Sequence, residues 1–435
     1  MLGLAGLLGS TAAAQVDSDG IGRPALSSEG GGWQGNLDRL GIAIDLSYTG
    51  DFVANTRGGN ARKRTYLGTL DATLAWDMQA LFERDLGVLF VYGLWNHGGR
   101  PSDFVGDVQA TDNIEAPDAV RLFEAWWQRT FLDERMSLLV GLYDVNSEFY
   151  AIDSAELFLN GSFGMGGELG NTGRSGPSTF PVAGWGARLK AEPTRGFELQ
   201  VAVMEGAPGD PRRPTATSLD FDHDEGAFVI AEIAHHRFTS TADDEEDDIT
   251  RPLQRRRLGR AWADRPKWLR VGLGTWLYTA KQPHVSRSDG MGDPIQSRGH
   301  PGLYLTADYE ADHLWRDRDT SMSLFVQLGF ADGDVGQFAG YSGAGATFVG
   351  LVPGRARDES GVAIAAAFNG DAFRDTARAA GNEPAVAEIV LEWTHRIAFT
   401  EWFSLQGDVQ YVVNPGGVRD RPDAVVLGLR WVVGL

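Results

Sequence analysis

The chain of 435 residues contains no cysteine, so it has neither a disulfide framework nor a thiolate metal site. A protein that crosses an oxidising compartment gains from this absence, because it carries no thiol to misoxidise. The sequence also lacks any apolar run of about 18 residues, which excludes a membrane-spanning helix. The formal net charge is -20, and phosphate binding needs a basic surface, so we expect no nucleic-acid partner.

A period of two in hydrophobicity is the main pattern that the sequence does contain. At the C-terminal end, Val409 and Tyr411 alternate with Asp408 and Gln410. Successive side chains of a strand face opposite sides, so such a run has one apolar and one polar face. The pattern predicts about sixteen strands, at 41–55, 65–77, 86–96, 119–130, 136–144, 182–192, 197–205, 227–238, 267–281, 303–311, 321–330, 341–352, 360–369, 385–399, 405–413 and 425–433.

The connections between these strands alternate in length. The shorter ones are 78–85, 132–135, 193–196, 312–319, 353–358 and 399–401, and the longer ones are 97–117, 146–181, 207–225, 282–300 and 370–383. The charged segment 240–266 departs from this rule. Short turns at one end and long loops at the other are typical of an outer-membrane barrel. Because segment 146–181 is rich in aromatic residues, we expect part of it to fold into the lumen.

We therefore predict an all-β fold: a transmembrane antiparallel β-barrel of about sixteen strands, with long loops and short helical segments in the N-terminal region, at 36–40 and 78–84. Residues 1–15 resemble the remnant of a signal peptide, 16–35 a linker, and 36–435 a single outer-membrane barrel domain. Alternation alone also fits a secreted soluble β-sandwich with a polar exterior. In a barrel of this size, the polar face lines a water-filled lumen instead.

No motif in the sequence points to catalysis. The sequence has no HExxH, GxSxG or Walker A pattern, so we expect no enzyme activity and no cofactor. His235 and His236 are the only adjacent histidines, and neighbouring strand residues face opposite sides. We therefore expect one of them in the lumen and one on the outer wall, rather than a metal site.

The polar strand face supplies the candidate pore-lining residues. Sugars need hydrogen-bond donors and acceptors for their hydroxyls and aromatic rings for their C–H faces. We expect Arg188 and Lys190 to form a mixed-charge narrowing with Arg121 and Glu124, and Gln128 to offer a further acceptor. The remaining candidates are inward charges and ring side chains near the constriction: Asp71, Glu232, Asp408, Trp126, Trp95, Trp127, Phe158 and Trp185. As an alternative, the charged residues only keep the lumen hydrated. For the tryptophans, the alternative is the aromatic girdle at the lipid interface.

Several motifs along the chain resemble the OprB-type carbohydrate-selective porins. They include Leu40-Gly41-Ile42 with Tyr48, 55–60, Arg121-Leu122 through Trp126 with Gln128, Val140 to Asp144 leading to Phe149, 160–164, 354–358, 409–417 and 424–430. The resemblance implies a sixteen-stranded barrel for the passive diffusion of small sugars, with inward-folded loops that narrow the pore. The charged segment 240–266 departs from the family pattern.

The resemblance also implies a location and partners. These are the outer membrane of a Gram-negative bacterium, its lipid, the barrel assembly machinery and small sugars, while a homo-oligomer stays open. A general or ion-selective porin is the first alternative. An outer-membrane enzyme and a soluble sugar-binding β-protein are less favoured alternatives.

Overall fold

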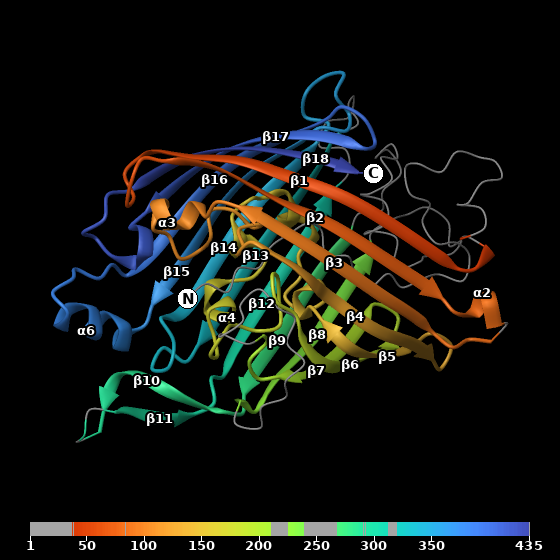
Figure 1. Ribbon diagram of the computed structural model, residues 1–435, viewed down its shortest axis with the longest axis horizontal. Helices are drawn as coiled ribbons and strands as arrows, with labels where there is room; N and C mark the ends of the chain where they lie inside the picture. Colours follow the sequence, from red (N-terminus) through yellow and green to blue (C-terminus); the bar gives the residue numbers. More distant parts are fainter. Residues whose placement is uncertain are drawn as a thin grey trace.

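Sixteen antiparallel strands close into one barrel in the computed structural model (Figure 1). The structure describes residues 37, 39–82, 84–209, 225–238, 268–289, 291, 293–311 and 320–434. The barrel strands are β1 Ile42–Arg57, β2 Arg64–Asp77, β3 Val88–Gly98, β4 Ala119–Phe131, β5 Met136–Tyr143, β6 Gly184–Thr194, β7 Phe197–Glu205, β8 Ala227–Phe238, β9 Trp268–Tyr278, β12 Gly302–Ala311, β13 Ser321–Ala331, β14 Phe338–Val349, β15 Glu359–Asn369, β16 Ala387–Ala398, β17 Phe403–Val413 and β18 Ala424–Gly434.

Each strand pairs with its neighbour in sequence along most of the wall, and β1 pairs with β18 to close it. Closure leaves no free strand edge, which is the condition for a sheet to cross a bilayer. The predicted fold class and strand count are therefore confirmed. No helix among the described residues is long and apolar enough to cross a membrane.

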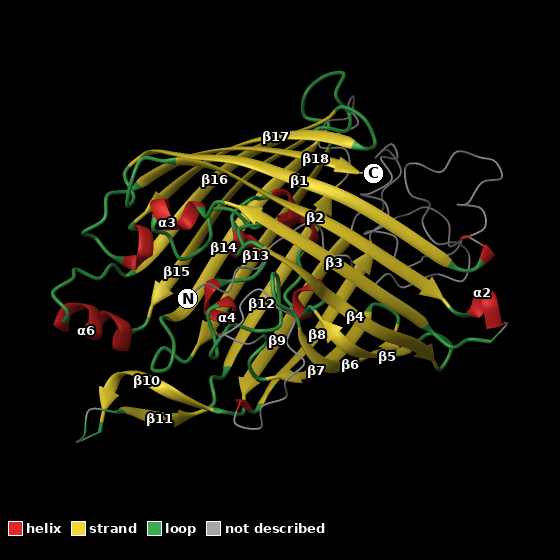
Figure 2. Ribbon diagram, viewed as in Figure 1, coloured by secondary structure: helices red, strands yellow, loops and turns green. Residues whose placement is uncertain are grey.

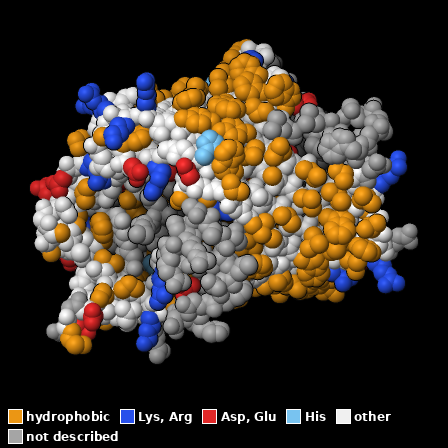
Figure 3. All heavy atoms as spheres, in the orientation of Figure 1, with side chains coloured by type: hydrophobic (Ala, Val, Ile, Leu, Met, Phe, Trp, Pro, Cys, Tyr) orange, Lys and Arg blue, Asp and Glu red, His pale blue; other side chains and the backbone are white. Residues whose placement is uncertain are grey.

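The two faces of the wall follow the predicted alternation. In the β17–β18 pair, Val409 lies opposite Leu427, and both are exposed on the outside of the barrel. Gln406 lies opposite Arg430, and both are buried on the inside. Figure 3 shows hydrophobic side chains gathered on the outer surface of the strand wall, at the top and right of the view. The apolar face thus points to lipid and the polar face to the lumen.

The connections differ from the prediction in two places. At the long-loop end, β1–β2 and β13–β14 are joined by only 58–63 and 332–337, so loop length does not alternate strictly. The long connections contain elements that the alternation did not indicate: a two-stranded sheet of β10 (Lys281–Ser288) and β11 (Pro294–Arg298), and the helix α6 (Asp371–Ala379). Figure 1 shows β10, β11 and α6 at the end of the barrel opposite to α2 (Gln79–Phe82).

The predicted helical segment 78–84 corresponds to α2. The predicted signal remnant 1–15, the linker 16–35, the charged segment 240–266, the turn 312–319 and most of the loop 207–225 lie outside the described residues.

Candidate pore constriction

The loop between β5 and β6, residues 144–183, enters the barrel and is called L3 below. Figure 2 shows it as green loop and short red helices inside the yellow strand wall. It contains three short 3-10 helices, Val145–Ser147, Asp153–Leu157 and Gly161–Phe163, and the helix α4, Gly167–Gly170. The side chains of Phe149, Tyr150, Phe158 and Phe163 are fully buried. The prediction that this loop folds into the lumen is confirmed.

Carboxylates of the inner wall hold L3 through its backbone. The backbone N–H of Tyr150 donates to Glu232 Oε2 at 3.1 Å, and that of Ser154 donates to Asp308 Oδ2 at 3.0 Å. The N–H groups of Leu159 and Asn160 donate to the two oxygens of Glu392 at 2.6 and 3.0 Å. Irregular backbone at membrane depth needs such partners, because an unpaired N–H away from water is costly. The wall carboxylates therefore act as acceptors for the loop.

Small residues of the wall make room for the loop. A Cβ added at Gly361 of β15 would lie 2.8 Å from Cζ of Phe158. One added at Gly329 of β13 would overlap the carboxylate of Glu168. These glycines allow side chains of L3 to lie directly against the strand backbone, so the sequence of the wall is shaped to the loop.

A second loop, 99–118 between β3 and β4, also folds inward, although the residue pattern predicted this only for segment 146–181. It begins with the short helix α3, Pro101–Val105. The backbone N–H groups of Val108 and Gln109 donate to Glu388 of β16 at 3.1 Å. Gln410 of β17 donates to the carbonyl oxygen of Thr111 at 2.8 Å. The constriction is therefore built by two loops.

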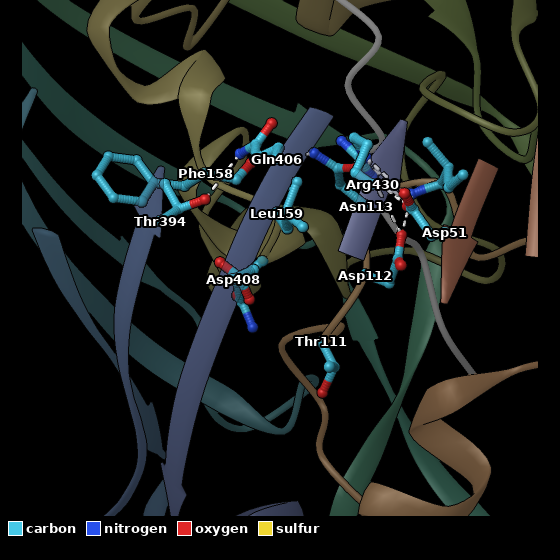
Figure 4. A network of polar contacts seen from close by, with 12 residues as sticks. Asp51, Thr111, Asp112, Asn113, Phe158, Leu159, Thr394, Gln406, Asp408 and Arg430 are labelled. Carbon is cyan, nitrogen blue, oxygen red and sulfur yellow. Dashed lines mark hydrogen bonds and ion pairs between the residues drawn. The ribbon is translucent and has the colours of Figure 1, made fainter. Parts of the chain in front are cut away.

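Asp408 and Arg430 belong to a polar network beneath these loops (Figure 4). Arg430 of β18 donates to both oxygens of Asp51 of β1, at 2.6–3.0 Å, and to Asn113 at 2.7 Å. Burial and the neighbouring Asp51 raise the pKa of Asp112 in the second loop, against the opposing effect of Arg430. Asp408 accepts from Gln410 at 3.0 Å and is buried. The predicted inward position of Asp408 is confirmed, although the loops cover it.

The guanidinium of Arg188, on β6, donates all of its hydrogen bonds to other residues of the protein. Its Nε and Nη2 donate to the two oxygens of Glu148 at 2.6 and 2.7 Å, and Nη2 also donates to Gln128 Oε1 at 2.9 Å. Its Nη1 donates to the hydroxyl and the carbonyl oxygen of Ser137. All five N–H groups of the guanidinium are engaged, and only 1% of the residue is exposed.

The partners of Arg188 differ from the expected arrangement. Gln128, expected as an acceptor for sugar hydroxyls, accepts from Arg188 instead, and Glu124 is not among the hydrogen-bond partners of Arg188 in the described part of the chain. Glu148 comes from L3, so the ion pair ties the start of this loop to the wall. Although burial opposes ionisation, the charges of Arg188 and Lys190 lower the pKa of Glu148, and it is held as a carboxylate. Arg188 therefore fixes the loop.

Lys190 stands two residues further along β6 and remains open to the lumen. Its Nζ lies 2.9 Å from Glu198 of β7, and their side chains are 30% and 14% exposed. Across β8 and β9, His236 lies 3.9 Å from Glu198, and Arg270 pairs with Glu232. We call Lys190, Glu198, His236, Arg270 and Glu232 the charged strip. It brings together the predicted residues Lys190 and Glu232 with three that were not selected from the sequence.

Arg121 and Glu124 both face inward although they are three residues apart. An irregularity in the β3–β4 pairing, between Tyr92 and Gly93, shifts the alternation of β4 by one residue. Arg121 donates to the carbonyl oxygen of Pro181 at 3.0 Å, and Glu124 accepts from Trp126 Nε1 at 3.1 Å. The side chains of Arg121, Glu124 and Trp126 are all buried. They therefore support L3 and the wall, and do not face Arg188 across an open pore.

Asp71 of β2 is also inward and buried, and it accepts from Tyr92 at 2.5 Å.

The predicted ring side chains divide between the two faces. Trp126 is inside, with its ring 4.7 Å from that of Phe90, and Phe158 is buried within L3. Trp95 is 44% exposed on the outer wall, and Trp127 donates to Leu86 near the short-turn end. Trp185 on β6 is half-buried. The girdle alternative therefore holds for Trp95 and Trp127.

His235 and His236 divide in the same way. His235 lies on the outer wall and His236 in the lumen, as expected.

A sixteen-stranded barrel with an apolar outer wall, a polar inner wall and loops folded into its lumen defines the class of outer-membrane porins. The chain belongs to the carbohydrate-selective porin, OprB family, whose sequence model matches residues 61–434. It is an outer-membrane porin for carbohydrates.

Relatives of known name agree with this assignment. The chain is 22% identical to Porin B of Pseudomonas aeruginosa, over 92% of this chain and 89% of that one. The high-pH structure of Pseudomonas putida OprB matches with a TM-score of 0.75 at 19% identity, over 93% of this chain and 96% of the other. Its low-pH structure matches with a TM-score of 0.55 at 14% identity, over 94% and 98%. These structural likenesses establish the fold.

Proposed function

We propose that the porin selects small sugars at the charged strip, where the Lys190–Glu198 pair meets the permeating molecule. The observation that carries this proposal is the 30% exposure of the Lys190 side chain, paired with Glu198, in a lumen whose other charges are mostly buried. An ammonium donates hydrogen bonds and a carboxylate accepts them, so the pair offers both partners that a sugar hydroxyl needs. Because the positive and the negative charge offset each other, the pair does not favour the passage of an ion over that of a neutral solute.

Arg188 has a different role in this proposal. With all of its N–H groups occupied, it offers no donor to a sugar, and it acts as a positioning residue for Glu148 and L3. The buried residues Arg121, Glu124, Trp126, Asp71 and Asp408 shape the constriction in the same indirect manner. Glu232 takes part through Arg270 and through the backbone of Tyr150.

The test is a pair of charge-removing variants, Lys190→Gln and Glu198→Gln, studied in planar bilayers and in swelling liposomes. We expect sugar block of the ion current to weaken in both. The reversal potential should move toward cation selectivity in Lys190→Gln and toward anion selectivity in Glu198→Gln, because each leaves one charge uncompensated.

Arg396→Gln is the matched control. Arg396 pairs with Glu359 at 2.6 Å on β16 and β15, outside the charged strip, and the pair is also partly exposed. The control should change the reversal potential without weakening sugar block. Equal loss of sugar block in the control and in Lys190→Gln would remove the charged strip from the selective site and favour a general porin.

The remaining partners follow from the same role. We propose that the apolar outer wall contacts outer-membrane lipid, that the barrel assembly machinery inserts the chain, and that transport proceeds without catalysis or a cofactor. A homo-oligomer is testable by cross-linking in native membranes.

A further inference from the structure

The connection between β1 and β2 carries a group of cations in a strongly acidic chain. We call Arg57, Arg62, Lys63 and Arg64 the basic edge. All four are exposed, and none forms an ion pair with a carboxylate among the described residues. The carboxylate of Asp423, at the neighbouring end of β18, accepts hydrogen bonds from Tyr411 Oη at 2.7 Å and from the N–H of Asn414. The net charge is -20, so this local excess of positive charge runs against the rest of the chain.

Two of these cations face the membrane rather than the pore. Arg64 lies opposite Ala54 in the β1–β2 pair, on the outward face. Arg57 lies opposite Val425 of β18, because an irregularity after Asn55 returns it to the outward face. At the same end of the barrel, the last outward side chains of β13 and β15 are Phe330 and Phe368, which carry no charge.

An aromatic cluster lies on the same outer wall, next to the basic edge and closer to the middle of the membrane. The next outward pair below Ala54 and Arg64 is Phe52 with Tyr66, whose rings are 4.8 Å apart. Tyr48, Trp431, His97 and Trp95 continue it, with ring distances of 5.0 Å for Tyr48–Trp431 and 4.8 Å for Trp95–His97. In Figure 3, Lys and Arg side chains gather at the upper left, over the long-loop end, and hydrophobic side chains cover the wall beyond them.

We propose that the basic edge and this aromatic cluster bind the phosphorylated glycolipid of the outer leaflet, lipid A. Its phosphates meet Arg57 and Arg64, and its acyl chains lie along the rings below. Unpaired guanidinium groups suit phosphate because their N–H groups donate two at a time. Aromatic side chains at the level of the head groups are suited to the boundary between polar and acyl regions. The site lies outside the pore and therefore does not depend on the mechanism of sugar selection.

The test uses the purified full-length chain, folded in detergent micelles, and measures equilibrium binding of lipid A that carries two phosphates. The double variant Arg57→Gln, Arg64→Gln should bind roughly thirtyfold more weakly, at about 1 kcal/mol for each cation near an anionic surface. The control, Lys281→Gln with Arg287→Gln, removes the same charge from exposed residues of β10 and should bind lipid A as the unmodified chain does. Circular dichroism verifies that both variants are folded.

Two further probes separate the possible sources of phosphate. Dephosphorylated lipid A should bind weakly to every form of the protein, and inorganic phosphate at the concentration of the lipid phosphate should not displace lipid A. Displacement by inorganic phosphate would overturn the assignment to a lipid. Unchanged binding in the double variant, an equal loss in the control, or tight binding of dephosphorylated lipid A would overturn the basic edge as the site.

Discussion

The Arg188–Glu148 pair offers the most direct test of how L3 is held in the pore. We predict that Arg188→Met destabilises the folded barrel and loosens the start of the loop. The substitution removes both parallel hydrogen bonds to Glu148 and leaves this carboxylate, 12% exposed, without its main partner. It also deprives Gln128 and Ser137 of their donor.

The expected magnitude follows from the burial of the pair. Removing one partner of a buried ion pair costs about 3–5 kcal/mol, because the other charge stays in the protein interior without compensation. Adding Glu148→Gln removes that stranded charge, so the double variant should be less destabilised than the sum of the two single variants. The loop should also become mobile at its β5 end, which raises the single-channel conductance of Arg188→Met.

Denaturant-induced unfolding in micelles measures the free energies for the four proteins of this cycle, and planar-bilayer recording measures the conductance. A variant Arg188→Met within about 1 kcal/mol of the original, with unchanged conductance, would refute the role of this pair as a clamp. Additive effects of the two substitutions would refute the direct coupling of Arg188 to Glu148.

Three further predictions test the wall, the loop and its buried acid. Leu429→Arg should lower the free energy of unfolding by about 2–4 kcal/mol, since its side chain faces lipid, whereas the inward Ser404→Arg should cost less; equal costs would contradict the face assignment. Deleting 157–170 should raise single-channel conductance, and an unchanged value would place this segment outside the conducting path. Burial raises the pKa of Glu168 from 4.5 to about 7, so the folded state binds the proton more tightly than the unfolded state and loses stability as pH rises from about 4.5 to 7. Melting temperatures of Glu168→Gln should decline less over this range than those of the original chain, and parallel declines would exclude Glu168 as the cause.

The barrel itself was predictable because its main constraint is local. Each strand must show lipid an apolar face, and this produces a period of two that the sequence displays directly. The strands Phe197–Glu205 and Ala227–Phe238 have the bounds that the pattern predicts. By contrast, β4 contains an irregularity that places Arg121 and Glu124 on one face, and strict alternation cannot anticipate such a shift.

The candidate site was less predictable because it depends on contacts between distant segments. Alternation identified Arg188 and Lys190 as inward side chains, and this was correct. It could not distinguish the buried Arg188 from the open Lys190, since the difference arises from Glu148 in a loop that folds back over the wall. The second inward loop is held by Glu388, about 280 residues away in sequence, and no local pattern reports such a contact.

The inward-folded loops explain why the inner wall carries so many carboxylates. A loop inside a barrel brings backbone N–H groups to a depth where little water can satisfy them. Glu232, Asp308 and Glu392 satisfy several of them at hydrogen-bond distance. Carboxylates that bind the loop backbone are largely covered by the loop and do not meet the permeating solute. The number of acidic residues on the inner face is therefore a poor guide to ion selectivity. Selectivity should instead follow the few charges that stay partly exposed, such as those of the Lys190–Glu198 pair. Under the proposed function, a chain of net charge -20 can therefore still form a pore suited to neutral sugars.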